Sequence, residues 1–435
     1  MTARRTIRPL VASGASRDGF VSASEYENVS EKPRAFPMWL LLTGILLIPA
    51  GLNVHLSGEG LKFTPGRAAI ALLLLPALSV LLRASRRIVA SDIFAFLTSA
   101  WMVGSRIPDD GLNPSAVAAV IELFGGYIVG RAYFYGPRAL KEFLRIFKVV
   151  TFLVIMIAVL DPLFGQNVAQ TIAAMIAQTP VSISNQYRFG IVRAASTIEM
   201  AELYGTFCCA AASIFLFLED NKTRKFGWAG FCLFGCILAL SSGPLLAFTI
   251  IIFFTAYDYL FKRFSKRWKL VNALLALFLL IVFFVVDRPL PWLISHMTLD
   301  PETGFFRLYV FDYVAQQISM SPLVGYGFGA VGDDEFLGTT TVDNVWLVCA
   351  ARYGIPMIVF FLFANLATFA SLGSARGNRS NSPFMMSAGT GLTQVIVAFM
   401  LVGLTVHFWN AMWQFWAVCI GIRGSIKEWH AQQKT

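Results

Sequence analysis

Residues 269–287 read KLVNALLALFLLIVFFVVD, an almost unbroken apolar run between a lysine and an aspartate. A helix needs about 20 such residues to cross the hydrocarbon core of a bilayer. Lipid offers the backbone no hydrogen-bond partners, so a run that crosses it is expected to be helical. The stretch therefore predicts a transmembrane helix, and it decides the fold class because similar runs recur along the chain.

The composition leads to the same fold class. The 435 residues are 57% hydrophobic and 14% charged, with a mean hydropathy of +0.65, whereas soluble domains carry about 25% charged residues. A soluble globule this apolar would expose large apolar patches. We predict an all-α, polytopic integral membrane protein of about 12 transmembrane helices. The predicted spans are 37–54, 66–83, 90–104, 114–132, 146–164, 199–218, 226–240, 243–261, 269–287, 343–371, 384–405 and 407–424.

The net charge of +10 is distributed unevenly between the two sides of these spans. If the N-terminus is cytoplasmic, the cytoplasmic segments hold 27 of the 35 Lys and Arg residues. This is the positive-inside pattern of membrane proteins. The basic excess therefore indicates a multi-pass protein with both termini in the cytoplasm, and no nucleic-acid partner is expected.

The chain divides into a central membrane domain and two short tails. Residues 1–36 are polar and lack the apolar segment of a signal peptide, so we expect a disordered cytoplasmic tail. The membrane domain is expected over 37–425, followed by a cytoplasmic tail at 426–435. All six cysteines fall inside predicted spans, where small apolar packing is the favoured role. No group of residues has metal-binding spacing, so neither a metal nor a cofactor is expected.

The longest segment between spans is an outer, periplasmic loop at about 287–342. Apolar and aromatic residues recur there at three- and four-residue spacing, which predicts an amphipathic helix suited to the membrane interface. Pro322 would end that helix, and the glycine-rich sequence PLVGYGFG follows at 322–329. Alternate glycines allow a tight turn and close approach to a ligand, although a turn without a ligand has the same sequence. The helical stripe consists of Phe306, Tyr309, Val310, Tyr313 and Val314.

Three of the arginines on the outer side, which generally lacks basic residues, are candidates for ligand binding: Arg188 and Arg193 in a second outer loop at 165–198, and Arg307 in the large loop. Guanidinium groups suit two-point capture of phosphate oxygens. Contact with lipid headgroups or solvent is the open alternative.

Several carboxylates near the membrane complete the set of candidates. Glu199 and Glu202 lie near the outer end of the sixth span, and Asp343 and Asn344 begin the tenth, where capping of the helix is the alternative to a functional role. Glu122 lies within the fourth span, where ionisable residues are costly. We expect Glu122 to pair with a neighbouring helix, with Arg352 as an available partner.

The order of these motifs resembles the O-antigen ligase/polymerase superfamily, which contains Wzy-type polymerases and O-antigen ligases. The resemblance covers about 185–370 and rests on the segment from Arg193 to Phe207, the short Ser-rich turn at 240–245, the arginine-bearing helix and glycine turn at 306–329, and the helix that starts with Asp343-Asn344. Ligases often carry a histidine where this chain has Asp343, and some polymerases of the superfamily have Asp-Asn, so the resemblance favours a polymerase.

The resemblance implies a glycosyltransferase of the bacterial inner membrane. Such an enzyme would polymerise undecaprenyl-pyrophosphate-linked oligosaccharide repeat units into exopolysaccharide or O-antigen at the periplasmic face. Its implied partners are the lipid-linked glycan, membrane lipid and a chain-length regulator. The implied substrate-binding residues are Arg188, Arg193, Arg307, Tyr326 and Asn344, and the implied catalytic residues are Asp343 and Glu199.

Other functions stay open. An O-antigen ligase would transfer the glycan to a lipid acceptor, and a multi-span transporter or lipid flippase would have a similar number of spans. Transporters place their polar elements near the middle of the bilayer, whereas the polar clusters of this chain fall in outer loops. A non-catalytic scaffold for envelope assembly is the remaining reading.

Overall fold

A computed structural model describes the chain over 35–56, 61–83, 86–107, 111, 113–178, 185–261, 264, 267–289, 292, 301–328, 342–369 and 382–433. The tail predicted at 1–36 lies outside these residues, apart from 35 and 36, which begin the first helix. The glycine at 329 that closes the predicted turn also lies outside them.

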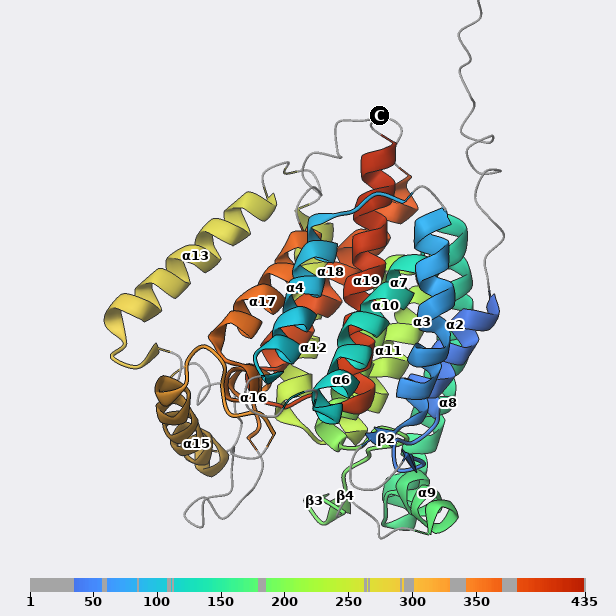
Figure 1. Ribbon diagram of the computed structural model, residues 1–435. Helices are drawn as coiled ribbons and strands as arrows, with labels where there is room; N and C mark the ends of the chain where they lie inside the picture. The colour runs from blue at the N-terminus through green and yellow to red at the C-terminus, as the bar shows by residue number, and fades with distance from the viewer. Residues whose placement is uncertain are drawn as a thin grey trace, which may run out of the picture. The chain divides into compact units, whose positions relative to one another are not determined.

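The described chain is helical apart from two small antiparallel hairpins (Figure 1). Two of the helical segments, η1 and η2, are π-helical. The helices are α2 (Ala35–Leu42), η1 (Thr43–Leu47), α3 (Pro65–Arg83), α4 (Ala90–Gly104), α6 (Pro114–Val120), η2 (Ile121–Gly125), α7 (Gly126–Tyr133), α8 (Gly136–Phe164), α9 (Val168–Ala177), α10 (Ala201–Leu218), α11 (Lys222–Leu238), α12 (Ser242–Leu260), α13 (Arg267–Val285), α15 (Pro301–Met320), α16 (Val345–Tyr353), α17 (Ile355–Phe369), α18 (Pro383–Val402) and α19 (Asn410–Gln432). The hairpins are β1 (Val54–Leu56) with β2 (Leu61–Phe63), and β3 (Tyr187–Arg188) with β4 (Ile191–Val192).

The prediction of an all-α, polytopic membrane protein is confirmed. Each predicted span has a helical counterpart among the described residues. Six helical stretches are long and apolar enough to cross a membrane, judged by length and composition: Pro65–Arg83, Pro114–Tyr133, Gly136–Phe164, Ala201–Leu218, Ser242–Leu260 and Pro383–Val402. Shorter apolar helices accompany them at Ala35–Leu47, Ala90–Gly104, Val168–Ala177, Ala276–Val285 and Ile355–Phe369.

The structure also differs from the predicted spans in five places. The helix predicted at 37–54 ends at Leu47. The predicted span 343–371 is two helices, α16 and α17, which meet at Gly354. Gly354 has φ +78°, a backbone conformation that L side chains rarely adopt. Helix α8 begins ten residues earlier than predicted, and α9 occupies the loop predicted at 165–198. Helix α19 continues to Gln432, whereas the sequence predicts a tail from residue 426.

The core of the bundle is built around α10 and α19. Helix α10 packs between α11 and α18, and α19 packs against α7 and α18. Phe147 stacks on Phe415 with ring centroids 5.8 Å apart, and Phe399 lies 5.8 Å from Trp416. These rings fill the space between helices, as close packing of a protein interior requires.

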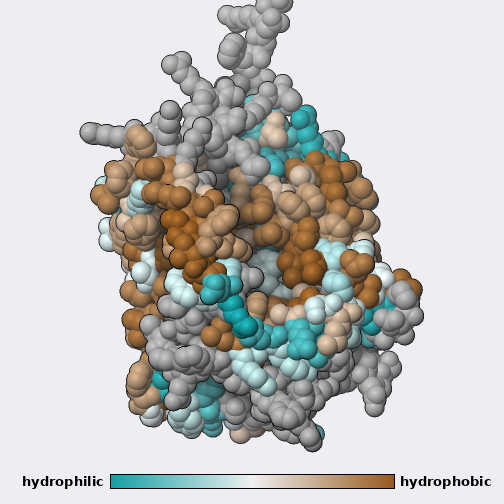
Figure 2. Space-filling view, turned by 90° about the vertical axis from the view of Figure 1, so that its left-hand side faces the viewer, coloured by the Kyte–Doolittle hydropathy of each residue, from teal (hydrophilic) through white to brown (hydrophobic). Residues whose placement is uncertain are grey.

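Hydrophobic side chains also cover much of the outside of the bundle. On the face seen in Figure 2 they gather in a band, with hydrophilic residues gathered below it. The outward residues of α12 and α13 are almost all apolar, including Ile252, Phe253, Leu277 and Phe284, which are exposed. A contiguous exposed apolar surface of this extent is expected of a protein surrounded by lipid.

The two ends of the bundle carry different structures (Figure 1). One end holds α9 and both β hairpins, and we call it the hairpin end. At the opposite end, where α19 finishes, Glu428 pairs with Arg86 and Arg131 at 2.7 Å in each case. The candidate functional residues lie toward the hairpin end.

The predicted amphipathic helix is present as α15, which ends two residues before Pro322. Val310 and Val314 are buried and form a small cluster with Val348 and Ala351 of α16, whereas Tyr309 is half exposed. The buried face of α15 therefore packs on α16, and this contact positions the arginine of α15 beside the start of α16.

Candidate functional site

The β3–β4 hairpin brings Arg188 and Arg193 to the end of α11. Its two-residue turn consists of Phe189 and Gly190, both with positive φ, which is the pattern of a tight hairpin. Arg188 donates from Nη1 to the Leu240 carbonyl at 2.8 Å, and Arg193 donates from Nε to the Ala239 carbonyl at 3.1 Å. The last carbonyls of a helix lack partners within it, so both arginines serve as caps and are held in fixed positions.

A carboxylate on α10 meets these arginines. Arg193 Nη2 lies 2.6 Å from Glu202 Oε1, and Arg193 Nη1 donates to the Gln186 side chain at 2.8 Å. The second oxygen of Glu202 is buried and has no hydrogen-bond partner among the described residues. Arg193 is therefore already paired, and Glu202 keeps one oxygen available to a second cation.

Arg307 of α15 and Asp343 at the start of α16 complete the group. Arg307 interacts electrostatically with Asp343, Glu202 and Arg188. Burial lowers the pKa of the Arg307 guanidinium, and the two carboxylates oppose that shift. Burial raises the pKa of Asp343 and Arg307 opposes the rise; the residue stays exposed although its carboxylate is partly desolvated by surrounding protein. We call Arg188, Arg193, Arg307, Glu202 and Asp343 the arginine cluster.

The arginine cluster carries three guanidiniums against two carboxylates. Its charge is therefore +1 when all five groups are ionised. The Nε of Arg307 is buried without a hydrogen-bond partner among the described residues. A cationic group of this kind can receive an anion, because charge-assisted hydrogen bonds to guanidinium are strong.

Two further predicted residues make structural contacts toward opposite ends of α16. Asn344 caps α16, since its Oδ1 accepts from the backbone N–H groups of Trp346 and Leu347 at 2.9 and 3.0 Å. Its Nδ2 donates to the Leu404 carbonyl at 2.9 Å. Tyr326 belongs to the turn after α15, and its backbone N–H donates to the Ala351 carbonyl at 2.7 Å. Substrate binding by these two side chains stays a prediction.

Glu199 does not belong to the arginine cluster. It is buried just before α10, and its neighbours are Asn410 and Ala411 at the start of α19, with Glu122 farther off. Burial raises the pKa of Glu199 to about 7, although Asn410 and the backbone N–H groups of Glu199 and Ala411 lower it. Glu199 is therefore a carboxyl group poised to accept or release a proton near neutral pH.

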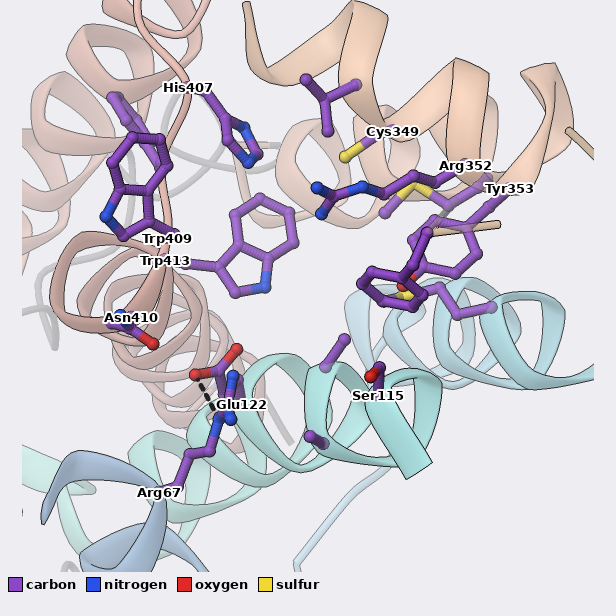
Figure 3. A pocket seen from close by; sticks show the side chains of 17 residues that line it. Arg67, Ser115, Glu122, Cys349, Arg352, Tyr353, His407, Trp409, Asn410 and Trp413 are labelled. Atoms are coloured by element: carbon purple, nitrogen blue, oxygen red, sulfur yellow. Dashed lines mark hydrogen bonds and ion pairs between the residues drawn. The ribbon is translucent and has the colours of Figure 1, made fainter. Parts of the chain in front are cut away.

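A cavity of about 380 Å³ has Asn410 in its wall (Figure 3). Asn410 is common to the surroundings of Glu199 and the cavity wall. The cavity combines charged, aromatic and small side chains from α3, α6, η2, α16 and the segment before α19. Its lining residues are Arg67, Met102, Ser115, Ala118, Ala119, Glu122, Phe328, Val348, Cys349, Arg352, Tyr353, Met357, His407, Phe408, Trp409, Asn410 and Trp413.

The charged groups of the cavity pair differently from our prediction. Glu122 lies on η2 and accepts hydrogen bonds from Arg67 Nε and Gln414 Nε2, both at 2.8 Å. Glu122 thus pairs with a neighbouring helix, as predicted, but its partner is Arg67 of α3 and not Arg352. Arg352 makes no ion pair among the described residues, and its guanidinium lies 4.9 Å from the Phe328 ring centroid. In the sequence, Arg352 is only an available partner, as a charged residue within a predicted span, and the helix arrangement that pairs Glu122 with Arg67 is not visible there.

His407 faces Arg352 across the cavity (Figure 3). Burial lowers the pKa of His407 to about 3, and the charge of Arg352 contributes to this shift. Its Nδ1 is buried and has no hydrogen-bond partner among the described residues. His407 is therefore a neutral imidazole with an unused polar atom. In the described part of the chain, no group of three His, Cys, Asp or Glu side chains is arranged to hold a metal ion.

Comparison with known proteins found one matching family model. Residues 228–362 match the family model Wzy_C, described as O-antigen ligase. The matched stretch contains Arg307, Asp343 and Arg352, whereas Arg188 and Arg193 precede it. No curated protein matches the chain. The match covers under a third of the chain and supports its similarity to the O-antigen ligase/polymerase superfamily of membrane proteins.

Proposed function

We propose that this protein is a lipid-linked oligosaccharide polymerase of the bacterial inner membrane. It would join undecaprenyl-pyrophosphate-linked repeat units into exopolysaccharide or O-antigen at the periplasmic face. The observation that carries the proposal is the convergence of Arg188, Arg193 and Arg307 around Glu202 and Asp343. A diphosphate is the substrate group that a net positive set of guanidiniums suits best.

In the proposed reaction, an acceptor hydroxyl oxygen attacks the anomeric carbon of the lipid-linked glycan. The bond between that carbon and the pyrophosphate oxygen breaks, and the electron pair leaves with the undecaprenyl pyrophosphate. Arg307 and its neighbours would neutralise the charge that develops on the leaving phosphate, which is the principal contribution that fixed cationic groups make to such a step. The hydroxyl proton passes to a carboxylate.

Glu199 is the preferred candidate for the proton acceptor. Its pKa of about 7 gives a carboxylate that is both available and basic near neutral pH. It also lies three residues from Glu202 in the sequence, and its neighbour Asn410 lines the cavity. Asp343 is the second candidate, since it belongs to the arginine cluster itself.

The proposed orientation places the hairpin end in the periplasm and both termini in the cytoplasm. Basic residues at the opposite end support it, because Arg86, Arg131 and Lys148 all lie there and positive residues accumulate on the cytoplasmic side of membrane proteins. The pyrophosphate site would then face the periplasm. The proposal also includes a cytoplasmic tail at residues 1–36 and a chain-length regulator that binds the protein.

An O-antigen ligase is the second candidate function, because the matching family model carries that description. A ligase would use the same leaving group but would transfer the glycan to a lipid acceptor. The presence of Asp343, where ligases often carry histidine, supports the polymerase instead.

Reconstitution of the purified full-length protein into liposomes with a lipid-linked oligosaccharide tests the proposal. Longer glycans on the same carrier lipid are expected, and the Arg307→Glu protein serves as the inactive control. Transfer of the glycan only to an added lipid acceptor would show that the protein is a ligase and not a polymerase. Movement of the substrate across the bilayer without a new glycosidic bond would overturn both and indicate a transporter.

A further inference from the structure

No residue of the arginine cluster lines the cavity of Figure 3, and the proposed transfer reaction gives the lining residues no role. Helix α16 connects the two regions: Asp343 and Asn344 stand at its start, and Arg352 lies in its last turn. The nine residues of α16 span about 13 Å at the rise of an α-helix. A group bound at Arg352 is therefore well removed from a pyrophosphate bound beside Arg307.

The charge of the cavity is positive. Arg67 and Glu122 form an ion pair and neutralise each other, and His407 is uncharged. Arg352 remains as a cation without a carboxylate partner among the described residues. Figure 3 shows its guanidinium directed into the cavity. An unpaired cation in a partly dry site favours an anionic ligand group.

The rest of the wall suits a sugar ring. Trp409, Trp413, Phe328 and Tyr353 supply aromatic surface, on which the apolar face of a ring can pack. Among polar groups, Ser115, Asn410 and the unpartnered Nδ1 of His407 can bind hydroxyls. Small-molecule sites generally combine a mostly apolar lining with a few placed polar groups, in volumes of about 300–1,000 Å³.

From these features we propose that the cavity binds a carboxylate-bearing sugar residue of the glycan, with Arg352 gripping the carboxylate and the tryptophans packing on the ring. The inference rests on the proposed function, since it identifies the bound sugar as part of the substrate. It adds a specificity: the repeat unit contains an acidic sugar, whose carboxylate binds at the end of α16 away from Arg307.

Sugar binding by the purified full-length protein in detergent tests this inference without any transfer reaction. Sodium glucuronate, glucose and inorganic phosphate, at constant ionic strength, are titrated while tryptophan fluorescence is followed. The signal of the cavity is identified by its loss in Trp409→Phe and Trp413→Phe proteins. Glucuronate is expected to saturate the signal at concentrations at least about tenfold lower than glucose, because a charge-assisted contact is lost with the neutral sugar.

Two substitutions of the same arginine and one matched control complete the design. Arg352→Gln is expected to raise the half-saturating concentration of glucuronate about tenfold, and Arg352→Lys to restore part of the loss. Arg288→Gln is the control, since Arg288 is exposed and pairs with Asp312. Equal gel-filtration profiles of all proteins verify that they are folded.

Three results would overturn the inference. The first is that glucuronate and glucose give equal fluorescence responses, or that neither gives a response. The second is that the response to glucuronate is unchanged in Arg352→Gln. The third is saturation by phosphate at lower concentrations than glucuronate, which would indicate a phosphate or lipid headgroup site. The Arg307→Gln protein separates this test from the proposed function. It is expected to lose polymer synthesis and to bind glucuronate as the wild type does, so either proposal can fail while the other holds.

Discussion

Arg193 and Glu202 form an ion pair of 2.6 Å that joins the segment after β4 to the first turn of α10. Both side chains are largely buried, and the second Glu202 oxygen lies within electrostatic reach of Arg307. Because Glu202 already neutralises Arg193, the arginine cluster owes its excess positive charge mainly to Arg307 and Arg188. This arrangement identifies Arg307 as the most informative residue to change.

Arg307→Glu is expected to lower polymer synthesis at least about 100-fold, since loss of one preorganised group that stabilises transition-state charge has that order of effect. Polymer length and yield in the reconstituted system are the measurement. Arg288→Glu is the matched control at an exposed arginine, and it should retain wild-type yield. Unchanged polymer in a correctly inserted Arg307→Glu protein would remove the pyrophosphate role from this cluster.

The rate of polymer synthesis is expected to rise with pH through about 7, because Glu199 must be deprotonated to accept the hydroxyl proton. Glu199→Gln should lower the rate at least about 100-fold and abolish that rise. Asp343→Asn should keep the rise. The reverse outcome, with the pH dependence lost in Asp343→Asn alone, would assign the proton transfer to Asp343.

The same carboxyl predicts a pH dependence of stability that needs no enzymatic assay. The folded pKa of Glu199 lies above the usual 4.5, so the folded state holds the proton more tightly than the unfolded state. Its contribution to stability is complete below pH 4.5 and is lost as pH rises through about 7, a change of about 3 kcal/mol. Glu199→Gln should therefore show a smaller fall in apparent Tm between about pH 5 and pH 8.

Thermal unfolding in detergent at several pH values measures this effect. Asp312→Asn provides the control at an exposed carboxylate and should reproduce the wild-type slope. Identical slopes for Glu199→Gln and wild type would mean that Glu199 is not a protonated carboxyl in the folded protein.

The membrane architecture could be predicted from the sequence because lipid selects residues by hydropathy alone. Such a signal does not mark where a helix ends inside the protein. Hydropathy does not reveal the break between α16 and α17, because the two helices form one apolar stretch. Only the positive φ of Gly354 separates them. Helix α8 likewise extends beyond its apolar part, because its first turns pack against protein and carry Arg138 and Lys141.

The candidate site could be predicted only in part, for a related reason. The predicted spans put Arg188, Arg193 and Arg307 in loops of the same side, and in the structure Arg307 interacts electrostatically with Arg188 and with Glu202, the partner of Arg193. The partner of Glu122 depends on which helices are neighbours, and sequence spacing does not contain that information. The same helix arrangement leaves Arg352 without an ion pair among the described residues.

Gly354→Ala is expected to destabilise the protein strongly. A Cβ at this position would lie 1.9 Å from the Leu323 carbonyl oxygen, which is backbone and cannot rotate away, and φ is +78°. A left-handed conformation for a non-glycine residue adds a cost of about 1–3 kcal/mol. Gly227→Ala is the matched control, because a Cβ there meets nothing within 4 Å and alanine favours a helix. Thermal unfolding should show a lower apparent Tm for Gly354→Ala and an equal or higher one for Gly227→Ala.

The buried ion pairs at the end opposite the hairpins lead to the last prediction. Glu428 is fully buried and binds Arg86 and Arg131 at 2.7 Å, and its other oxygen accepts the Arg87 backbone N–H at 2.7 Å. Arg131 has a second partner in Asp92 at 2.7 Å, whereas Arg86 has no other carboxylate at this distance among the described residues. Removal of Glu428 therefore leaves one buried guanidinium without its counter-charge.

Glu428→Gln is expected to destabilise the protein by about 3 kcal/mol, the order found when one partner of a buried ion pair is removed. Asp92→Asn should lower the stability by less, because the Asp92 carboxylate is partly exposed and Arg131 still pairs with Glu428. Glu142→Gln is the surface control: its partner Arg145 is 77% exposed, so the effect should be below about 1 kcal/mol. Denaturation of the three proteins in detergent gives the ranking. Equal stability of Glu428→Gln and Glu142→Gln would mean that water reaches this network and that α19 does not depend on it for its last turns.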